Sequence, residues 1–410
     1  MQIYKVLLFC LILRVSEAYY FVGLPPLVEL LFYLLIYGAG IIANKGIHFK
    51  LRKHQLIFLF VVLVSSLICY RGINGISVFV IMKVLIVAQL FQLDDWQKSK
   101  VFLHLNRWIW ILTILSVTFY LLAKIGMPSI GTVSWKQYTS NNYLFYFEDI
   151  RMITRFNGFT LEPGYMGILM TVMLVVNRFK MNKYTLVYLL VLIMTMSLGG
   201  LFITIVAFGV YYALFNSHKK KLVIGIFAAL ILGFSSVYFV ANAWNNGDNL
   251  LNEWIFSRLE YDEEKGFAGN NRAAKFDQQL AFLSFLNSDD IYMGMGNTAY
   301  TKLTTEEDDW AGYTTFIMKY GFIPMIFLFL AGFYYIKSLN NAKLVVPAAI
   351  VWLLDWWQHS ELFPPTIVMM FLFFELYSKP KPTKRKLLVK NVNNDSDEFI
   401  RKAQDISRDC

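Results

Sequence analysis

The stretch 151–167 combines charged side chains with the start of an apolar segment. It reads Arg-Met-Ile-Thr-Arg-Phe-Asn-Gly-Phe-Thr-Leu-Glu-Pro-Gly-Tyr-Met-Gly. Pro163 suits the first turn of a helix, where its missing N–H costs nothing, and a carboxylate at Glu162 favours the positive end of that helix. A capped helix that enters a membrane explains these two residues but leaves Arg151 and Arg155 unexplained. Since a guanidinium binds phosphate oxygens through two parallel hydrogen bonds, the arginines predict a phosphorylated ligand.

A second stretch, 270–297, carries further cationic groups. At 100° per residue, Arg272, Lys275 and Gln279 lie within about 60° of one another on a helix. Leucines continue near that edge, which is typical of a helix that lies at a membrane surface. The run 293–297, Met-Gly-Met-Gly-Asn, follows and indicates a tight glycine turn.

The segment 355–365 interrupts two apolar runs with ionisable groups, among them His359 and Glu361. Ionisable groups at membrane depth are costly and are functional by default, and a histidine can take up a proton near neutral pH. A loop of interfacial residues anchored by tryptophans explains the segment equally well. The acidic run 306–309 fits a solvated face better than a metal site.

The elements that must position these groups are strongly apolar. The 410 residues are 57% hydrophobic and only 16% charged, with a mean hydropathy of +0.49, whereas soluble domains have about 25% charged residues. This composition indicates a polytopic membrane protein. The net charge of +10 is scattered between apolar stretches, which disfavours nucleic-acid binding. The three cysteines form no metal-ligand spacing, so neither a metal nor a cofactor is expected.

The apolar stretches predict an all-α polytopic fold with about twelve transmembrane helices, since each approaches the ~20 residues that cross a bilayer. The first stretch could instead be a signal peptide, but Arg14 and Glu17 follow its apolar run closely, which favours an uncleaved helix. The predicted spans are approximately 3–22, 24–43, 55–71, 75–93, 107–125, 159–177, 184–199, 200–216, 221–241, 311–336, 344–358 and 362–378.

Lysine and arginine gather in alternate connections, which the positive-inside rule assigns to the cytoplasm together with both termini. Two long connections, 126–158 and 242–310, then lie outside, and loops this long are usually functional. The chain divides into a multi-pass membrane domain, 1–378, and a cytoplasmic basic and polar tail, 379–410. The basic connections are 44–54, 94–107, 178–183, 218–221, 337–343 and 379–390.

This topology predicts that four arginines lie outside, against the general charge bias. Such a cluster at a membrane face suits a lipid-linked phosphate or pyrophosphate, although solvated surface charges remain the alternative. The four are Arg151, Arg155, Arg258 and Arg272.

The run 155–159, Arg-Phe-Asn-Gly-Phe, followed by Glu-Pro-Gly at 162–164, resembles the signature of bacterial O-antigen polymerases of the Wzy type. Asn271-Arg272, Phe285 and Gly294-x-Gly296 resemble the external-loop pattern of that family, as does Lys-Tyr-Gly-Phe-Ile-Pro at 319–324. The layout resembles the family over nearly the whole chain. Related O-antigen ligases tend to carry a histidine in the large external loop, and 242–310 contains none.

The resemblance implies a GT-C-like membrane glycosyltransferase. It would join undecaprenyl-pyrophosphate-linked oligosaccharide repeat units into O-antigen, capsule or exopolysaccharide on the outer face of the cytoplasmic membrane. Arg155 and Arg272 would bind the pyrophosphate, with Arg151 and Arg258 in support. The catalytic base would be Glu162, or His359 with Glu361. The external aromatics that could stack on sugar rings are Trp135, Tyr138, Tyr143 and Trp310.

Implied partners are lipid-linked oligosaccharides, membrane lipid and a chain-length regulator, with no nucleic acid. An O-antigen ligase is one alternative, and a transporter such as a flippase of lipid-linked oligosaccharides is another. A flippase needs charges deep within its spans, and Lys83 is the main deep cation that the sequence offers.

Overall fold

The structure is a computed structural model that describes most of the chain between residues 26 and 377. The predicted first helix, most of the stretch 221–241 and the tail lie outside the described residues. The described ranges are 26–44, 46, 51–72, 75–135, 138–150, 155–160, 162–215, 236, 238–244, 248–249, 252, 256, 261–262, 266–267, 276–303, 313–339, 342–358 and 367–377.

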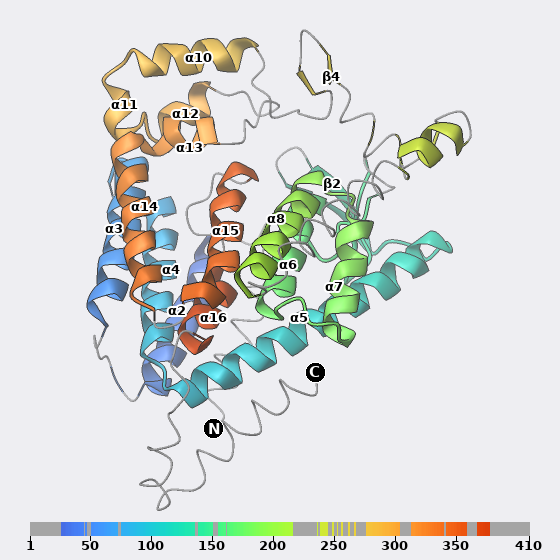
Figure 1. The fold of residues 1–410 in the computed structure, drawn as a ribbon, viewed down its shortest axis with the longest axis horizontal. Coiled ribbons are helices and arrows are strands. Elements are labelled where there is room, and N and C mark those ends of the chain that lie inside the picture. Colours follow the sequence, from blue (N-terminus) through green and yellow to red (C-terminus); the bar gives the residue numbers. More distant parts are fainter. Residues whose placement is uncertain are drawn as a thin grey trace, which may run out of the picture.

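The described chain is mostly helical, and each predicted apolar stretch within it coincides with a helix (Figure 1). The helices are α2 (Pro26–Ala43), α3 (Lys53–Cys69), α4 (Gly75–Gln92), α5 (Asp95–Lys124), α6 (Pro163–Val176), α7 (Lys183–Met194), α8 (Leu198–Phe215), α10 (Phe276–Leu286), α11 (Asp290–Met293), α12 (Asn297–Leu303), α13 (Tyr313–Tyr320), α14 (Phe322–Lys337), α15 (Ala342–Gln358) and α16 (Ile367–Tyr377).

Within the described residues, two helices, α5 and α8, are long and apolar enough to cross a membrane, and the bent pair α13–α14 is a third candidate. This number is far below the predicted twelve, since several other apolar helices span only 10–17 residues. Polar turns shorten them. For example, α6 begins only at Pro163, and α7 ends at Met194, before a turn whose Met196 has a positive φ.

Two predicted boundaries are wrong. The predicted connection 94–107 is helical, because Gln97 caps the start of α5 by accepting a hydrogen bond from the Asp94 N–H at 3.1 Å. The predicted single span 311–336 is bent by 108° between α13 and α14. Gly321 lies at that bend with a φ of 84°, a conformation that favours glycine.

The described chain is mostly helical, as the all-α prediction requires, but the connection 126–158 contains an antiparallel sheet that was not predicted. Its strands are β1 (Gly131–Trp135), β2 (Tyr138–Asn142) and β3 (Phe147–Asp149), in the order β1-β2-β3. Asn141 on β2 pairs with Thr132 on β1 and with Glu148 on β3. The segment is rich in threonine, serine and tyrosine, which fit a pleated, half-buried surface. A smaller ladder joins β4 (Tyr261–Asp262) and β5 (Gly266–Phe267).

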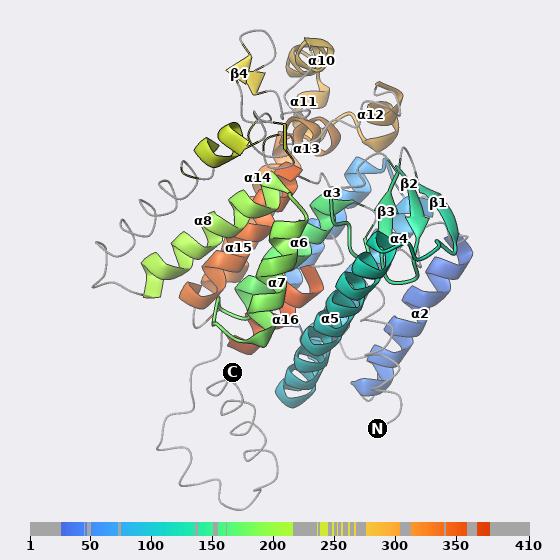
Figure 2. The same cartoon turned by 90° about the vertical axis from the view of Figure 1, so that its right-hand side faces the viewer.

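The helices form one bundle. Figure 1 shows α2, α3, α4 and α14 on one side, α6, α7 and α8 on the other, and α15 and α16 between them. α5 runs obliquely across the bundle and reaches the β-sheet at its far end (Figure 2). The core between α3, α14 and α16 is aromatic, with Phe58, Tyr335 and Phe371 in mutual ring contact.

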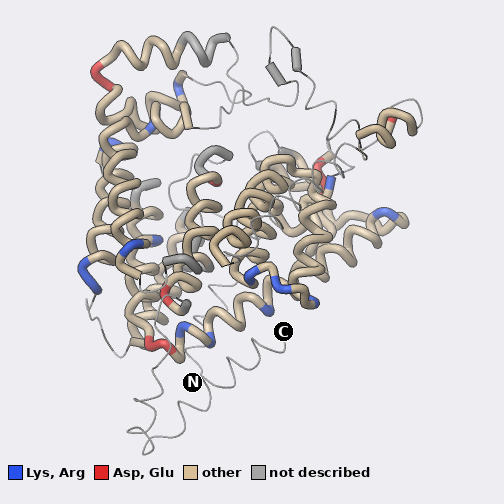
Figure 3. Tube along the Cα trace, in the orientation of Figure 1, with Lys and Arg blue, Asp and Glu red and all other residues tan. Residues whose placement is uncertain are grey.

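The helix ends next to the basic connections are joined by hydrogen bonds at one end of the bundle, which we call the basic end. There Gln97 Nε2 donates to Ala43 O at 3.1 Å, and Asn106 Nδ2 donates to Asn177 Oδ1 at 3.0 Å. In Figure 3 lysine and arginine recur along this end, at the lower side of the view. The helix ends that meet here adjoin the connections 44–54, 94–107 and 178–183.

The opposite end, which we call the loop end, holds the β-sheet and α10–α13 (Figure 1). The last turns of α3 and α5 reach it, because Arg71 Nη2 donates to Gly294 O at 2.6 Å and Lys124 Nζ lies 2.6 Å from Glu148 Oε1. The two long connections that the sequence predicts on one side of a membrane therefore meet the bundle at the same end.

Candidate functional site

The segment 155–160 is folded against the C-terminus of α7 at the loop end. Arg155 is only 7% exposed, and its Nε donates to Thr195 O at 3.1 Å while its Nη2 lies 3.4 Å from Met196 O. These carbonyls follow the last turn of α7, where a cation complements the helix dipole. The Phe156 N–H donates to Met194 O at 3.2 Å. Arg155 thus holds its own segment against the end of α7.

Glu162 and Pro163 occupy the positions that the sequence predicts. Pro163 begins α6, and Glu162 is the half-buried residue before it. A Cβ on Gly164 would lie 3.0 Å from Glu162 Oε1, so the carboxylate covers the first turn of the helix. The side chain of Glu162 therefore fills the space beside Gly164.

A carboxylate cluster that the sequence did not single out lies beside this segment. Glu148, 8% exposed, accepts a hydrogen bond from Lys124 Nζ at 2.6 Å on Oε1 and one from Tyr143 OH at 3.3 Å on Oε2. Tyr146 is fully buried, and its OH has no hydrogen-bond partner among the described residues. We call Lys124, Tyr143, Tyr146 and Glu148 the tyrosine–carboxylate cluster.

Aromatic stacking joins this cluster to the predicted signature. The Tyr146 ring stacks on Phe156 at 5.6 Å between centroids and on Tyr143 at 5.9 Å. Burial first, and then the neighbouring Glu148, raise the pKa of both Tyr143 and Tyr146, so their phenols remain hydrogen-bond donors at neutral pH. The signal in the sequence was Glu148 itself, a carboxylate within an aromatic run of a predicted external loop.

The glycine turn and the Lys-Tyr-Gly motif, predicted separately, touch each other. Gly294 and Gly321 have φ values of 73° and 84°, and a Cβ on Gly321 would lie 2.3 Å from Gly294 N. Met295 N–H donates to Met318 O at 2.8 Å across the junction. Arg71, at the end of α3, donates to Gly294 O and adds an arginine to the loop end that the sequence analysis missed.

The other predicted site residues lie in strands of the sheet or outside the described part of the chain. Only the backbone is described for Trp135 and Tyr138, which lie in β1 and β2. Among the predicted residues, the structure thus connects Tyr143 to Phe156 through Tyr146, and it places Arg155 at the end of α7 and Glu162 at the start of α6. The residues outside the described part of the chain are Arg151, Arg258, Arg272, Trp310, His359 and Glu361.

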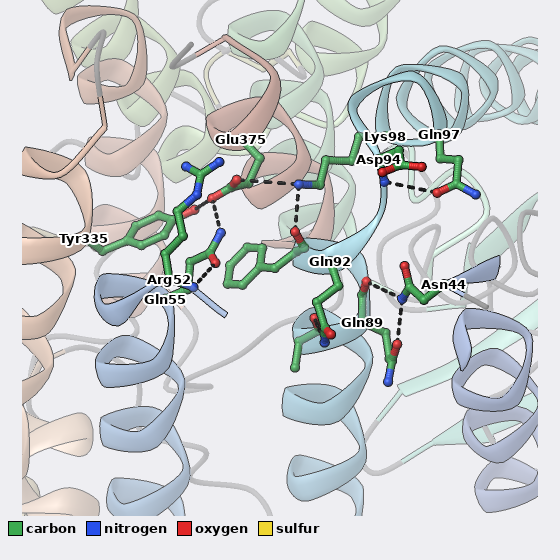
Figure 4. Close-up of polar contacts among 12 residues, drawn as sticks. Asn44, Arg52, Gln55, Gln89, Gln92, Asp94, Gln97, Lys98, Tyr335 and Glu375 are labelled. Carbon is green, nitrogen blue, oxygen red and sulfur yellow. Dashed lines mark hydrogen bonds and ion pairs between the residues drawn. The ribbon is translucent and has the colours of Figure 1, made fainter. Parts of the chain in front are cut away.

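A second buried carboxylate lies at the basic end, where Figure 4 shows side chains from α3, α5, α14 and α16 pointing toward one another. Glu375 Oε1 accepts from Gln55 Nε2 at 2.9 Å and from Tyr335 OH at 2.8 Å. Lys98 Nζ lies 3.7 Å from Glu375 Oε2 and donates to Phe91 O at 2.8 Å. The sequence did not predict this pair, because Lys98 fell in a predicted connection.

The protein was compared with known families, curated proteins and solved structures. No family model, no curated protein and no solved structure matches the chain. The function of the protein therefore has to be inferred from its own residues and their arrangement.

Proposed function

We propose that this protein is a membrane glycosyltransferase that polymerises undecaprenyl-pyrophosphate-linked oligosaccharide repeat units into O-antigen, capsule or exopolysaccharide. One observation carries the proposal. The two segments that resemble polysaccharide polymerases, 155–167 and the junction of Gly294 with Gly321, both lie at the loop end. The basic connections lie at the opposite end, so both segments would face the side on which translocated units arrive.

The chemistry is displacement at an anomeric carbon. The leaving pyrophosphate has to be stabilised, and an acceptor hydroxyl has to lose its proton to a base. We assign the pyrophosphate chiefly to Arg272, with Arg151 and Arg258 in support. Arg155 contributes charge and also holds its segment on α7. Glu162, or His359 with Glu361, remains a proposed base.

The proposed topology places the basic end and both termini in the cytoplasm and the connections 126–158 and 242–310 outside. The proposed fold is GT-C-like with about twelve membrane helices, the shorter of which require polar flanks at the interface or local bilayer thinning. Membrane lipid and a chain-length regulator are the proposed partners beside the substrate.

The test is to deplete the protein in cells that make the polysaccharide, to resolve saccharides by size and to determine which membrane face the lipid-linked units occupy. We expect single units that still reach their final acceptor and lipid-linked units on the outer face. Units confined to the inner face would reject the proposal in favour of a flippase, and long carrier-bound chains would indicate a ligase.

Charge geometry gives a second test. Arg272→Lys should lower polymer formation by on the order of a hundredfold at normal protein level, since a lysine cannot make two parallel hydrogen bonds. Lys302→Ala removes an exposed cation from α12, also at the loop end, and serves as the matched control. Normal polymer formation by the Arg272→Lys variant would indicate that Arg272 is only a solvated surface charge.

One observation favours the transporter alternative. The Lys98–Glu375 pair is buried inside the bundle, which is the kind of charge that a flippase of lipid-linked oligosaccharides needs. However, Lys98 is the fourth residue of α5 and Glu375 lies in the last turn of α16, so the pair sits at the end of the bundle rather than at its middle. The enzyme therefore remains the preferred assignment.

A further inference from the structure

We infer that the tyrosine–carboxylate cluster is the acceptor-saccharide subsite, in which Glu148 takes the proton of the attacking sugar hydroxyl. This inference rests on the proposed polymerase function and names Glu148 as its base, in place of Glu162 or of His359 with Glu361. In this proposal, the antiparallel sheet of the connection 126–158 holds Glu148 against the end of α5.

The Glu148 carboxylate is held in place by the cluster. Oε1 accepts a hydrogen bond from Lys124 Nζ at 2.6 Å, and Oε2 accepts one from Tyr143 OH at 3.3 Å. A carboxylate has about four lone-pair positions, so positions remain for a sugar hydroxyl. Lys124 is 34% exposed along its side chain, and Asn141, opposite Glu148 on β2, is half-buried. These two residues form the side from which an acceptor would approach.

Tyr146 provides the independent observation. A buried hydroxyl that lacks a partner costs about 1–3 kcal/mol, and the Tyr146 OH lacks one among the described residues. An oxygen of a bound saccharide would accept that hydrogen bond. The stacked rings of Tyr143, Tyr146 and Phe156 are at most 8% exposed, and their packing fixes the position of the Tyr146 phenol beside Glu148.

The proposed step balances. The acceptor hydroxyl gives its proton to the Glu148 carboxylate, and its oxygen forms the new bond to the anomeric carbon of the donor. The bond from that carbon to the pyrophosphate oxygen breaks, and its electron pair leaves with undecaprenyl pyrophosphate. Glu148 then returns its proton to water before the next cycle.

The competing explanation is that the Lys124–Glu148 pair only attaches the sheet to α5. Two conservative variants separate these possibilities. Glu148→Gln keeps the shape and the hydrogen-bond acceptors near Tyr143 but removes the base. Tyr146→Phe removes one oxygen that makes no hydrogen bond within the described structure, so a purely structural cluster would tolerate it without loss.

The experiment measures initial rates of chain lengthening. It uses purified, detergent-solubilised protein and lipid-linked repeat units extracted from the cells that make the polysaccharide. For Glu148→Gln we expect a fall in kcat of roughly 10²–10⁴-fold, the usual contribution of a positioned base, at an unchanged protein level. For Tyr146→Phe we expect KM for the acceptor to rise about 2–10-fold with kcat nearly unchanged, as for one lost hydrogen bond.

Binding of free repeat-unit oligosaccharide, released from the carrier, gives a second readout. Tyr146→Phe should weaken it by a similar factor. Wild-type kinetics in both variants, with polymer formation still dependent on the protein, would overturn the subsite and leave the proposed function intact. Saccharide binding that depends on Tyr146, in a protein whose depletion leaves the polymer unchanged, would keep the subsite and reject the polymerase.

Discussion

Two buried carboxylates, one at each end of the bundle, have the same kinds of neighbours and different surroundings. Glu375 at the basic end and Glu148 at the loop end each face a lysine and accept a hydrogen bond from a tyrosine. The lysine beside Glu375 is 4% exposed along its side chain, whereas the lysine beside Glu148 is 34% exposed. The lysine of the pair is therefore buried at the basic end and partly exposed to solvent at the loop end.

This difference fits a structural role for Glu375 and the catalytic role that we propose for Glu148. Glu375 receives groups from three other helices, and removal of its partner would leave a charge in an apolar interior. Glu148 is attached to one helix and one sheet, and a neighbouring phenol is without a partner among the described residues. The first arrangement fixes the packing of α16, and the second is the one to which we assign a ligand.

The largest expected effect is a contrast in activity between two isosteric variants. Glu148→Gln should lower the rate of polymerisation per folded molecule by roughly 10²–10⁴-fold. Glu375→Gln, the matched control, should change that rate less than severalfold, although it lowers the amount of protein in the membrane. Turnover normalised to the amount of folded protein measures the rates of both variants. An equal loss in the two would contradict the different roles of Glu148 and Glu375.

The next effect concerns stability. Lys98→Met leaves Glu375 without its cation and should destabilise the protein by about 3–5 kcal/mol, whereas the double variant Lys98→Met/Glu375→Met should regain most of that loss. Lys124→Met should cost only about 1–2 kcal/mol, between the values typical of exposed and buried pairs. Denaturant unfolding in detergent gives these values, and a Lys124→Met loss as large as that of Lys98→Met would contradict the comparison.

The junction at the loop end should be sensitive to a single methyl group. Gly321→Ala forces a φ of 84° on a residue with a Cβ, which would also lie 2.3 Å from Gly294 N, so we expect a loss of about 2–4 kcal/mol. Gly332→Ala within α14 is the control, because its Cβ would meet Trp352 only at 3.4 Å. Faster proteolysis of 276–303 in the first variant alone would confirm the prediction.

The smallest effect lies at the start of α7, near the basic end. Asn182 Oδ1 accepts hydrogen bonds from the N–H groups of Tyr184 and Thr185, both at 3.0 Å. Asn182→Ala should cost about 1 kcal/mol, the usual value of an N-cap, and should leave the rate per molecule unchanged. A shift of the thermal midpoint measures the first effect, and a clear change in turnover would argue that the basic end takes part in catalysis.

The sequence predicted where most helices lie, because an apolar run removed from water can satisfy its backbone hydrogen bonds within one helix. It also predicted that Pro163 begins a helix and that glycines form the turn at 293–297. The early start of α5 was missed, because its first turns carry Lys98 and Lys100 and resemble a basic connection. The bend at Gly321 was missed as well, because hydropathy averages across it.

The tyrosine–carboxylate cluster depends on contacts that no local pattern reveals. Lys124 and Glu148 lie 24 residues apart, and Tyr146 meets Phe156 only because the segment 155–160 folds onto α7. Similarly, Gln55 and Glu375 are 320 residues apart. For this second contact the sequence offered one signal, the lone carboxylate of Glu375 in the last apolar stretch, since burial of such a charge requires a partner.

Reconstitution tests the central claim most directly. The purified protein is placed in vesicles that contain undecaprenyl-pyrophosphate-linked repeat units and no other protein, and the carrier-bound saccharides are resolved by length. We expect the wild-type protein to produce a ladder of lengthened chains, and we expect Glu148→Gln to leave single units. Units that move between the two leaflets without lengthening would contradict the account and identify a transporter.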